Sequence, residues 1–321
     1  MERVIRTEGL TKTYGGSRGI ADVNLEVGEG EVFGFLGPNG AGKTTMIRTL
    51  MGFLKPTGGR AEVFGYDTRR QSVAVRALVG NLPGEFALED RMTGEQLLRF
   101  FARLRGVEDL SYARELTGKL GADLGRPMRK LSRGNKQKIG LVQAMFHRPP
   151  LLILDEPTGG LDPLVQEEFL KIVGEVRDEG RTVFFSSHVL GEVERVCDRV
   201  GIIRSGRLAA VETTSALTGK AFRHVRLTFA GPVDEAPFGR LEGVRDLESD
   251  GTTLSFTLHS GPDELVGLVS RASEENELVD LEYERPSLEE IFLAYYEPDD
   301  EPEEQDDGGA NAAAPVREEA S

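Results

Sequence analysis

The sequence of 321 residues contains one cysteine, Cys197, so it has no second thiol with which to form an internal disulfide. A lone cysteine suits a protein of the reducing cytosol. The sequence also lacks any run of about 18 consecutive apolar residues, the length that a membrane-spanning helix needs. Residues 1–4 do not begin the apolar core of a secretory signal peptide. We therefore expect a cytoplasmic chain without a membrane span.

Basic residues are too few for a typical nucleic-acid-binding protein. The chain has 39 Lys and Arg against 54 Asp and Glu, which gives a net charge of −15. Much of this charge lies in residues 297–321, where ten acidic residues and one basic residue sum to −9 and leave about −6 for the rest. That segment is rich in Pro, Asp, Glu, Gly and Ala, which predicts a disordered acidic tail. We expect no nucleic-acid partner.

A glycine-rich loop between an apolar strand, residues 32–36, and an apolar helix, residues 46–51, is the most informative feature. It matches G-x-x-x-x-G-K-[ST], in which glycines let backbone N–H groups point at phosphate oxygens and a helix N-terminus faces the same anion. A turn that only connects strand and helix is the alternative. We expect Lys43 to reach the β- and γ-phosphates and the Thr44 hydroxyl to bind Mg²⁺. The predicted phosphate-binding residues are Gly37, Pro38, Asn39, Gly40, Ala41, Gly42, Lys43, Thr44 and Thr45.

Two adjacent carboxylates, Asp155 and Glu156, end a second apolar strand at residues 151–154. An uninterrupted aliphatic run is typical of a parallel strand that is buried on both faces. Ligands of doubly wound sheets collect at the carboxyl ends of strands, so we expect both acids near the phosphate loop. Adjacent strand residues point in opposite directions, which predicts that Asp155 holds Mg²⁺ and Glu156 turns to the attacking water. A strand that ends in solvated acids is the alternative.

Three further residues have both a structural and a functional interpretation. His188 follows the apolar strand at residues 182–186 and could face the same crevice, or it could be a surface or capping residue. Tyr14, beside two glycines, could stack on a purine ring or pack at a sheet edge. Ser132 precedes a helix and is first of all a candidate N-cap.

The pattern changes near residue 220. Alternating residues predict strands at 224–229, 253–258 and 278–283 and a helix at 262–271, and a second helix is expected at 287–296. The predicted domains are a nucleotide-binding α/β domain at 1–219 with a helical subdomain at about 86–146, an α+β accessory domain at 220–296, and the tail at 297–321.

The order of the motifs resembles the ATP-binding subunit of ABC transporters over residues 1 to about 215. The phosphate loop is similar to Walker A, residues 151–156 to Walker B, and residues 131–138 to the family signature. The resemblance implies a P-loop NTPase fold and an ATPase that uses ATP and Mg²⁺. It implies catalytic roles for Glu156 and His188, metal contacts from Thr44 and Asp155, and adenine stacking on Tyr14. It further implies that Ser132, Gly134 and Asn135 contact the ATP of a facing subunit.

Two positions depart from the family pattern. The signature reads L-S-R-G-N in place of L-S-G-G-Q, and the glutamine of a loop that normally contacts Mg²⁺ and water is replaced by Gly84, with Glu85 beside it. Glu85 is a candidate substitute for that glutamine. Residues 285–292 resemble the ending of the type-2 exporter branch, which includes antibiotic and multidrug efflux ATPases.

The resemblance implies partners as well as chemistry. It implies a homodimer or a paired ATPase subunit, and a separate membrane permease that would hold the chain at the inner face of the cell membrane. The alternatives are a regulatory ABC-type ATPase, a nucleotide sensor without a transport role, and an importer subunit.

Overall fold

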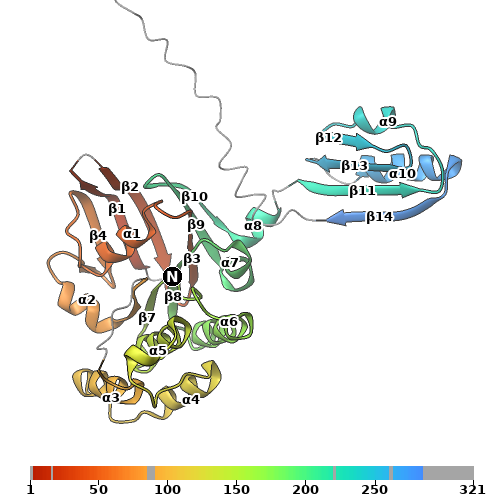
Figure 1. Cartoon of the computed structure of the whole chain (residues 1–321). Coiled ribbons are helices and arrows are strands. Elements are labelled where there is room, and N and C mark those ends of the chain that lie inside the picture. The colour runs from red at the N-terminus through yellow and green to blue at the C-terminus, as the bar shows by residue number, and fades with distance from the viewer. Residues whose placement is uncertain (1–2, 16, 85–90, 220–221, 260–262, 285–321) are drawn as a thin grey trace, which may run out of the picture.

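The computed structural model describes most of the chain, and Figure 1 traces its elements in order. Three sheets organise the described residues, two within the first 213 residues and one in the later part. The predicted helix at 287–296, the tail and Glu85 lie outside the described residues. The described residues are 3–15, 17–84, 91–219, 222–259 and 263–284.

A six-stranded sheet with the order β10-β9-β3-β8-β7-β6 is the centre of the first region. All of its neighbouring pairs are parallel except β9 and β10. Every residue of β3, β7 and β8 is buried, because alternate side chains enter separate cores on the two faces. The strands are β3 (Val32–Leu36), β6 (Val79–Leu82), β7 (Leu151–Asp155), β8 (Thr182–Ser187), β9 (Arg199–Arg204) and β10 (Arg207–Thr213).

The three central strands end at the same level. Leu36 pairs with Ser187, and Asp155 pairs with Ser186, so the carboxyl ends of β3, β7 and β8 are neighbours. The stacked rings of Phe33 and Phe184, with centroids 5.8 Å apart, hold two of these strands on one face. The loops that follow the three strands therefore meet at one edge of the sheet.

A second sheet, with the order β2-β1-β4-β5, packs on one face of the central sheet. Its strands are antiparallel. The first strand continues to Tyr14, which places the tyrosine at a strand end beside the central sheet's phosphate loop. The strands are β1 (Arg3–Tyr14), β2 (Ser17–Gly28), β4 (Gly58–Val63) and β5 (Tyr66–Asp67).

Helices cover the opposite face of the central sheet and extend beyond it as a helical region (Figure 1). The first of that region, α3, begins with a capping box in which the Thr93 hydroxyl accepts from the Gln96 N–H and the Gln96 side chain accepts from the Thr93 N–H. The N-cap of α6 is Asp162, followed by Pro163. The helices are α1 (Lys43–Leu50), α2 (Ser72–Leu78), α3 (Gly94–Arg105), α4 (Ser111–Leu120), the 3₁₀ turn Met128–Lys130, α5 (Arg133–Met145), α6 (Pro163–Asp178), α7 (Leu190–Val196) and α8 (Thr214–Gly219).

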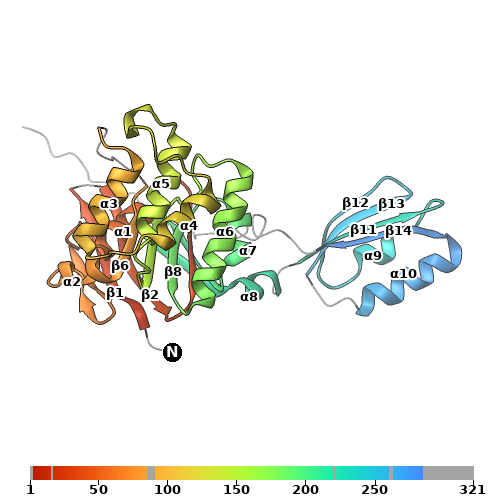
Figure 2. The ribbon, with the colours of Figure 1, turned by 90° about the horizontal axis from the view of Figure 1, so that it is seen from below.

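The third sheet has the order β12-β13-β11-β14 and is antiparallel throughout. Two helices lie on one of its faces (Figure 2), where Phe238 and Leu265 join the apolar side chains of the strands. The predicted strands and the predicted helix at 262–271 are present, whereas β12 and α9 had no sequence prediction. The elements are β11 (Arg223–Phe229), α9 (Ala236–Gly239), β12 (Val244–Ser249), β13 (Thr253–Leu258), α10 (Asp263–Glu275) and β14 (Leu278–Glu284).

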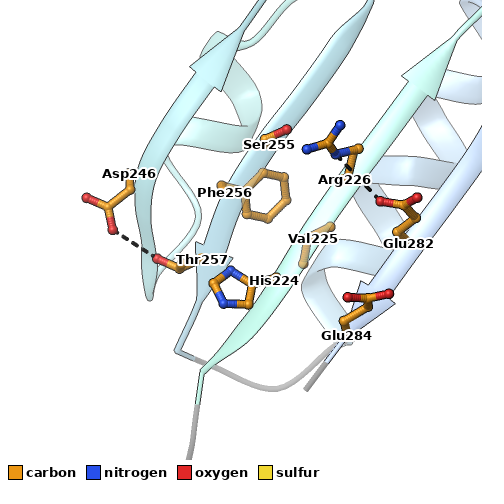
Figure 3. A pocket seen from close by; sticks show the side chains of 9 residues that line it. All are labelled: His224, Val225, Arg226, Asp246, Ser255, Phe256, Thr257, Glu282 and Glu284. Carbon is orange, nitrogen blue, oxygen red and sulfur yellow. Dashed lines mark hydrogen bonds and ion pairs between the residues drawn. The ribbon is translucent and has the colours of Figure 1, made fainter. Parts of the chain in front are cut away.

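The other face of the third sheet is polar and carries a cavity of about 330 Å³. Figure 3 shows side chains from four strands around it, including an ion pair between Arg226 and Glu282 at 3.5 Å. The Thr257 hydroxyl donates to an oxygen of Asp246 at 3.2 Å. Acidic and basic groups are mixed here, so the charge of this cavity does not select one class of ligand.

Candidate functional site

The phosphate loop is held in shape by two glycines whose surroundings admit no side chain. A Cβ atom at Gly37 would lie 2.5 Å from the carbonyl oxygen of Ile203, and one at Gly42 would lie 2.5 Å from the carbonyl oxygen of Gly19. Gly42 also has φ of 110°, in the region that favours glycine. It is the N-cap of α1, so the positive end of that helix opens onto the loop.

Lys43 folds back over the loop that it ends. Its ammonium group donates to the carbonyl oxygens of Gly37, at 2.6 Å, and Pro38, at 3.1 Å. The lysine is buried, with 6% of its surface exposed. A buried cation beside free helix N–H groups is a site for an anion, so the residues present fit the phosphates of a nucleotide.

Thr44 and Asp155 meet although 111 positions separate them. The Thr44 hydroxyl donates to Asp155 Oδ2 at 2.8 Å, and the Ser186 hydroxyl donates to Oδ1 at 2.6 Å. No group of three or more His, Cys, Asp or Glu side chains forms a metal cluster among the described residues. Mg²⁺ commonly binds one or two protein oxygens together with phosphate oxygens, and Thr44 and Asp155 fit that arrangement.

Glu156 lies outside the strand, and its φ of 50° places it in the left-handed region. The alternation argument for opposite directions was therefore wrong, because it assumed that both acids are strand residues. One carboxylate oxygen of Glu156 is 2.6 Å from His188 Nδ1. The other oxygen is 3.1 Å from Lys43 Nζ, an ion-pair distance without hydrogen-bond geometry. The carboxylate thus lies between the phosphate-loop lysine and the histidine.

Lys43, Thr44 and Glu156 line a cavity of about 290 Å³ that extends to Tyr14. The Tyr14 side chain is 44% exposed, and Lys12 Nζ lies 5.3 Å from its ring centroid. Gly19, which the sequence analysis did not single out, also lines the cavity. A Cβ atom there would be 2.8 Å from the Tyr14 ring, so glycine at this position lets the ring approach the loop.

The signature residues are absent from the lining of this cavity. Ser132 caps α5 by accepting the Asn135 N–H at 3.2 Å. The Asn135 side chain accepts from the backbone N–H of Asp123 and donates to its carbonyl oxygen. A Cβ atom at Gly134 would lie 2.6 Å from the carbonyl oxygen of Gly160. The structure therefore holds the signature turn by local contacts and does not bring it to this chain's own phosphate loop.

Gly84 lies against Asp155. A Cβ atom at Gly84 would be 2.9 Å from Asp155 Oδ2 and 3.1 Å from Cγ. The backbone therefore approaches the carboxylate more closely than a residue with a side chain would permit.

Two other positions were missed by the sequence analysis. The Ser186 hydroxyl, besides binding Asp155, accepts the backbone N–H of Glu156 at 3.1 Å. Gln137 Nε2 donates to the carbonyl oxygens of Glu156 and Pro157, at 3.2 and 3.0 Å. The sequence signal for Ser186 was a polar residue inside an apolar strand, and the signal for Gln137 was a polar residue on a buried helix face.

Comparisons with known proteins agree with this geometry. The sequence profile of the ABC transporter family matches residues 20–159. The chain is 35% identical over 302 residues to the daunorubicin resistance ATP-binding protein DrrA3 of Streptomyces coeruleorubidus, an alignment that covers 91% of this chain and 95% of that protein. It is 38% identical over 214 residues to the bacitracin transport ATP-binding protein BcrA of Bacillus licheniformis, covering 65% of this chain and 69% of that protein.

Solved structures agree as well. The ATP-binding subunit of an ABC transporter matches with a TM-score of 0.62 and 31% identity, covering 67% of this chain and 92% of that one. A dimeric ATP-binding cassette with ADP and phosphate shares the fold at 22% identity and a TM-score of 0.60, covering 65% of this chain and 98% of that one. The predicted α/β P-loop fold is confirmed. The chain belongs to the ABC transporter family, in which it is an ATP-binding subunit that hydrolyses ATP.

Proposed function

We propose that ATP hydrolysis by this chain powers export of a substrate, such as an antibiotic or another drug-like molecule, through a separate membrane permease. The observation that carries the proposal is the alignment over 95% of a daunorubicin resistance ATP-binding protein, which includes the third sheet as well as the nucleotide site. A linearmycin resistance ATP-binding protein of Bacillus subtilis, LnrL, aligns over 97% of its length at 31% identity. Among the described residues, no helix is both long and apolar enough to cross a membrane.

In this proposal Lys43 and the loop N–H groups bind the phosphates of ATP, and the Thr44 hydroxyl and Asp155 hold Mg²⁺, which offsets phosphate charge. Glu156 orients the attacking water and accepts its proton. His188, 2.6 Å from the Glu156 carboxylate, orients that carboxylate and faces the γ-phosphate. Tyr14 at the far end of the cavity stacks on the adenine ring.

The signature turn serves a second copy of the chain or a paired ATPase subunit. Ser132 and Gly134 lie at the N-terminus of α5, where helix N–H groups attract an anion. Asn135 keeps the turn in place through Asp123. Two subunits arranged head to tail would place this turn on the γ-phosphate bound by the facing Walker A loop, so that ATP closes the dimer and its hydrolysis opens it.

A candidate docking surface for the permease lies beside the helical region. Phe53, Val73 and Leu104 are 56%, 74% and 67% exposed. Arg105 of α3 donates to the carbonyl oxygens of Ala77 and Val79 at the end of α2, so both helices belong to one surface. Three exposed apolar side chains on this one surface favour a protein partner. The strand β6 begins at Val79 and leads to Gly84, which connects this surface to Asp155.

We further propose a domain boundary, a metal and a location for the chain. The nucleotide-binding domain ends near residue 219, and residues 220–296 form an accessory domain whose described part is the third sheet. Mg²⁺ is the metal of the site. The permease holds the chain at the inner face of the cell membrane.

The proposal is tested by affinity capture of a tagged Glu156→Gln chain from detergent-solubilised membranes of the source organism, with and without ATP, read by mass spectrometry. This substitution is expected to bind ATP without turning it over, which keeps the complex closed. We expect ATP-dependent recovery of a protein with several predicted membrane spans. Recovery of soluble partners alone, with an active wild-type ATPase as control, would favour a regulatory ABC-type ATPase.

A further inference from the structure

Glu192 is a buried carboxylate behind the nucleotide site that the mechanism above does not use. It lies in α7 and is 7% exposed. Burial raises the pKa of the Glu192 carboxyl above its ordinary value. An acid is costly to bury unless hydrogen bonds compensate, so its partners indicate what the position is for.

One partner holds the loop that bears His188. The Ser187 hydroxyl donates to Glu192 Oε2 at 3.0 Å and accepts the backbone N–H of Val189 at 2.9 Å. Ser187 and Val189 flank His188 on both sides. The His188 side chain itself is 53% exposed, so packing around the imidazole does little to orient it. Its direction therefore depends on its contact with Glu156 and on the backbone that Ser187 and Glu192 hold.

A second neighbour of Glu192 lies in the turn that bears Glu156. The Thr158 hydroxyl is a neighbour of the Glu192 carboxylate and lowers the pKa of that carboxyl, against the larger opposing effect of burial. Thr158 is 5% exposed and stands two residues after Glu156, in a turn where the Gly159 N–H donates to the Glu156 carbonyl oxygen at 3.1 Å. The unusual φ of Glu156 makes its side-chain direction sensitive to this turn.

We infer that Glu192 is a positioning residue that keeps the His188 imidazole in contact with the Glu156 carboxylate, through its hydrogen bond with Ser187 and its place beside Thr158. The inference rests on the proposed roles of Glu156 and His188. A carboxylate suits this position because it accepts the Ser187 hydroxyl and has a second oxygen that can accept from another hydroxyl group. Loss of these contacts would leave the nucleotide pocket intact, since neither Glu192 nor its two neighbours line it.

The test compares Glu192→Ala, Glu192→Gln and, as a matched control from the same helix, Val193→Ala, which removes buried apolar atoms and leaves the Glu192 carboxylate in place. Steady-state ATPase kinetics give kcat and KM for ATP, and thermal unfolding reports stability. We expect Glu192→Ala to lower kcat by about tenfold or more with little change in KM, because misplaced catalytic groups slow chemistry more than binding. Glu192→Gln retains one acceptor oxygen and should recover most of that loss. Val193→Ala should lower the unfolding temperature with little effect on kcat.

A double-substitution cycle with His188→Ala decides whether Glu192 acts through the catalytic pair. In the His188→Ala background we expect Glu192→Ala to add almost no further loss in kcat. If the two losses multiply, or if Val193→Ala lowers kcat as much, the inference is overturned. If His188→Ala alone leaves kcat unchanged, the proposed catalytic pair fails and the inference fails with it. If Glu192→Ala does not fold, Thr158→Val, which removes the hydroxyl beside Glu192, replaces it in the same double-substitution cycle with His188→Ala.

Discussion

The central sheet and the third sheet place their polar side chains differently. In the central sheet β3, β7 and β8 are covered on both faces, so the chemically active groups Asp155, Glu156 and His188 stand where strands end. In the third sheet only one face is covered, so polar residues such as Arg226 and Glu282 alternate along the strands. Burial of both faces thus concentrates the charged groups at the carboxyl ends of the central strands, where they can act together. One-sided burial spreads charge over a solvated face.

The strongest test of this comparison replaces one glutamate by glutamine at the edge of the central sheet and one in the third sheet. We expect Glu156→Gln to lower ATP turnover by about 100-fold or more while ATP binding is retained, because a positioned general base is lost. Glu282→Gln removes an exposed ion pair of a kind worth about 0–1 kcal/mol and should leave turnover unchanged. Steady-state ATPase assays and nucleotide titration measure both. Near wild-type ATP turnover in Glu156→Gln would contradict the role of Glu156 as the general base.

Lys43→Ala is a contrasting variant, which should weaken the binding of ATP, as measured by the same nucleotide titration.

A smaller effect is expected where the backbone touches the carboxylate edge. Gly84→Ala puts a methyl group within 2.9 Å of Asp155 Oδ2, an oxygen that is already held by Thr44. The carboxylate or the loop must shift, and we expect a loss of ATPase activity of about threefold to tenfold with little change in stability. Gly174→Ala is the control, since no atom lies within 4 Å of its added Cβ and helix propensity favours alanine. Full activity in Gly84→Ala would show that Asp155 tolerates displacement.

A third effect concerns stability at low pH rather than activity. Burial lowers the pKa of His147 to about 4, with further contributions from the nearby charges of Arg105 and Arg181. Below about pH 6.5, a histidine that is neutral in the folded state takes up a proton when the chain unfolds. The contribution of His147 to the free energy of unfolding is therefore present at neutral pH and is lost between about pH 6.5 and 4. His147→Phe should flatten the fall in unfolding free energy over that range in urea titrations.

His259 offers the matched position in the third part of the chain. The His259 side chain is exposed. Burial lowers the pKa of His259, as it does that of His147, but the shift is not large. We expect His259→Phe to leave the pH dependence of unfolding nearly as it is. An equal effect of both substitutions would mean that burial in the first region is not what makes His147 sensitive to acid.

Local motifs predicted the phosphate loop, the strand that ends at Asp155, the N-cap Ser132 and the strands of the third sheet, because each depends on neighbours in sequence. The positive φ of Glu156 escaped prediction, since it depends on contacts with Ser186 and Gln137 from other elements. Gly19 escaped because its role depends on where the Tyr14 ring lies in the folded chain, which the sequence does not reveal.

The sequence by itself determined the chemistry of this protein: a phosphate loop, a strand with two acids, a signature turn and a later histidine, each written in a short stretch of residues. Only the tertiary structure decided which of these groups act together. It joins Thr44 to Asp155 and Glu156 to both Lys43 and His188, whereas Ser132, Gly134 and Asn135 of the signature do not line the cavity at the phosphate loop. The reason is physical, because hydrogen bonds and ion pairs act over about 3 Å, and only the packing of strands brings residues that are 100 positions apart within that distance.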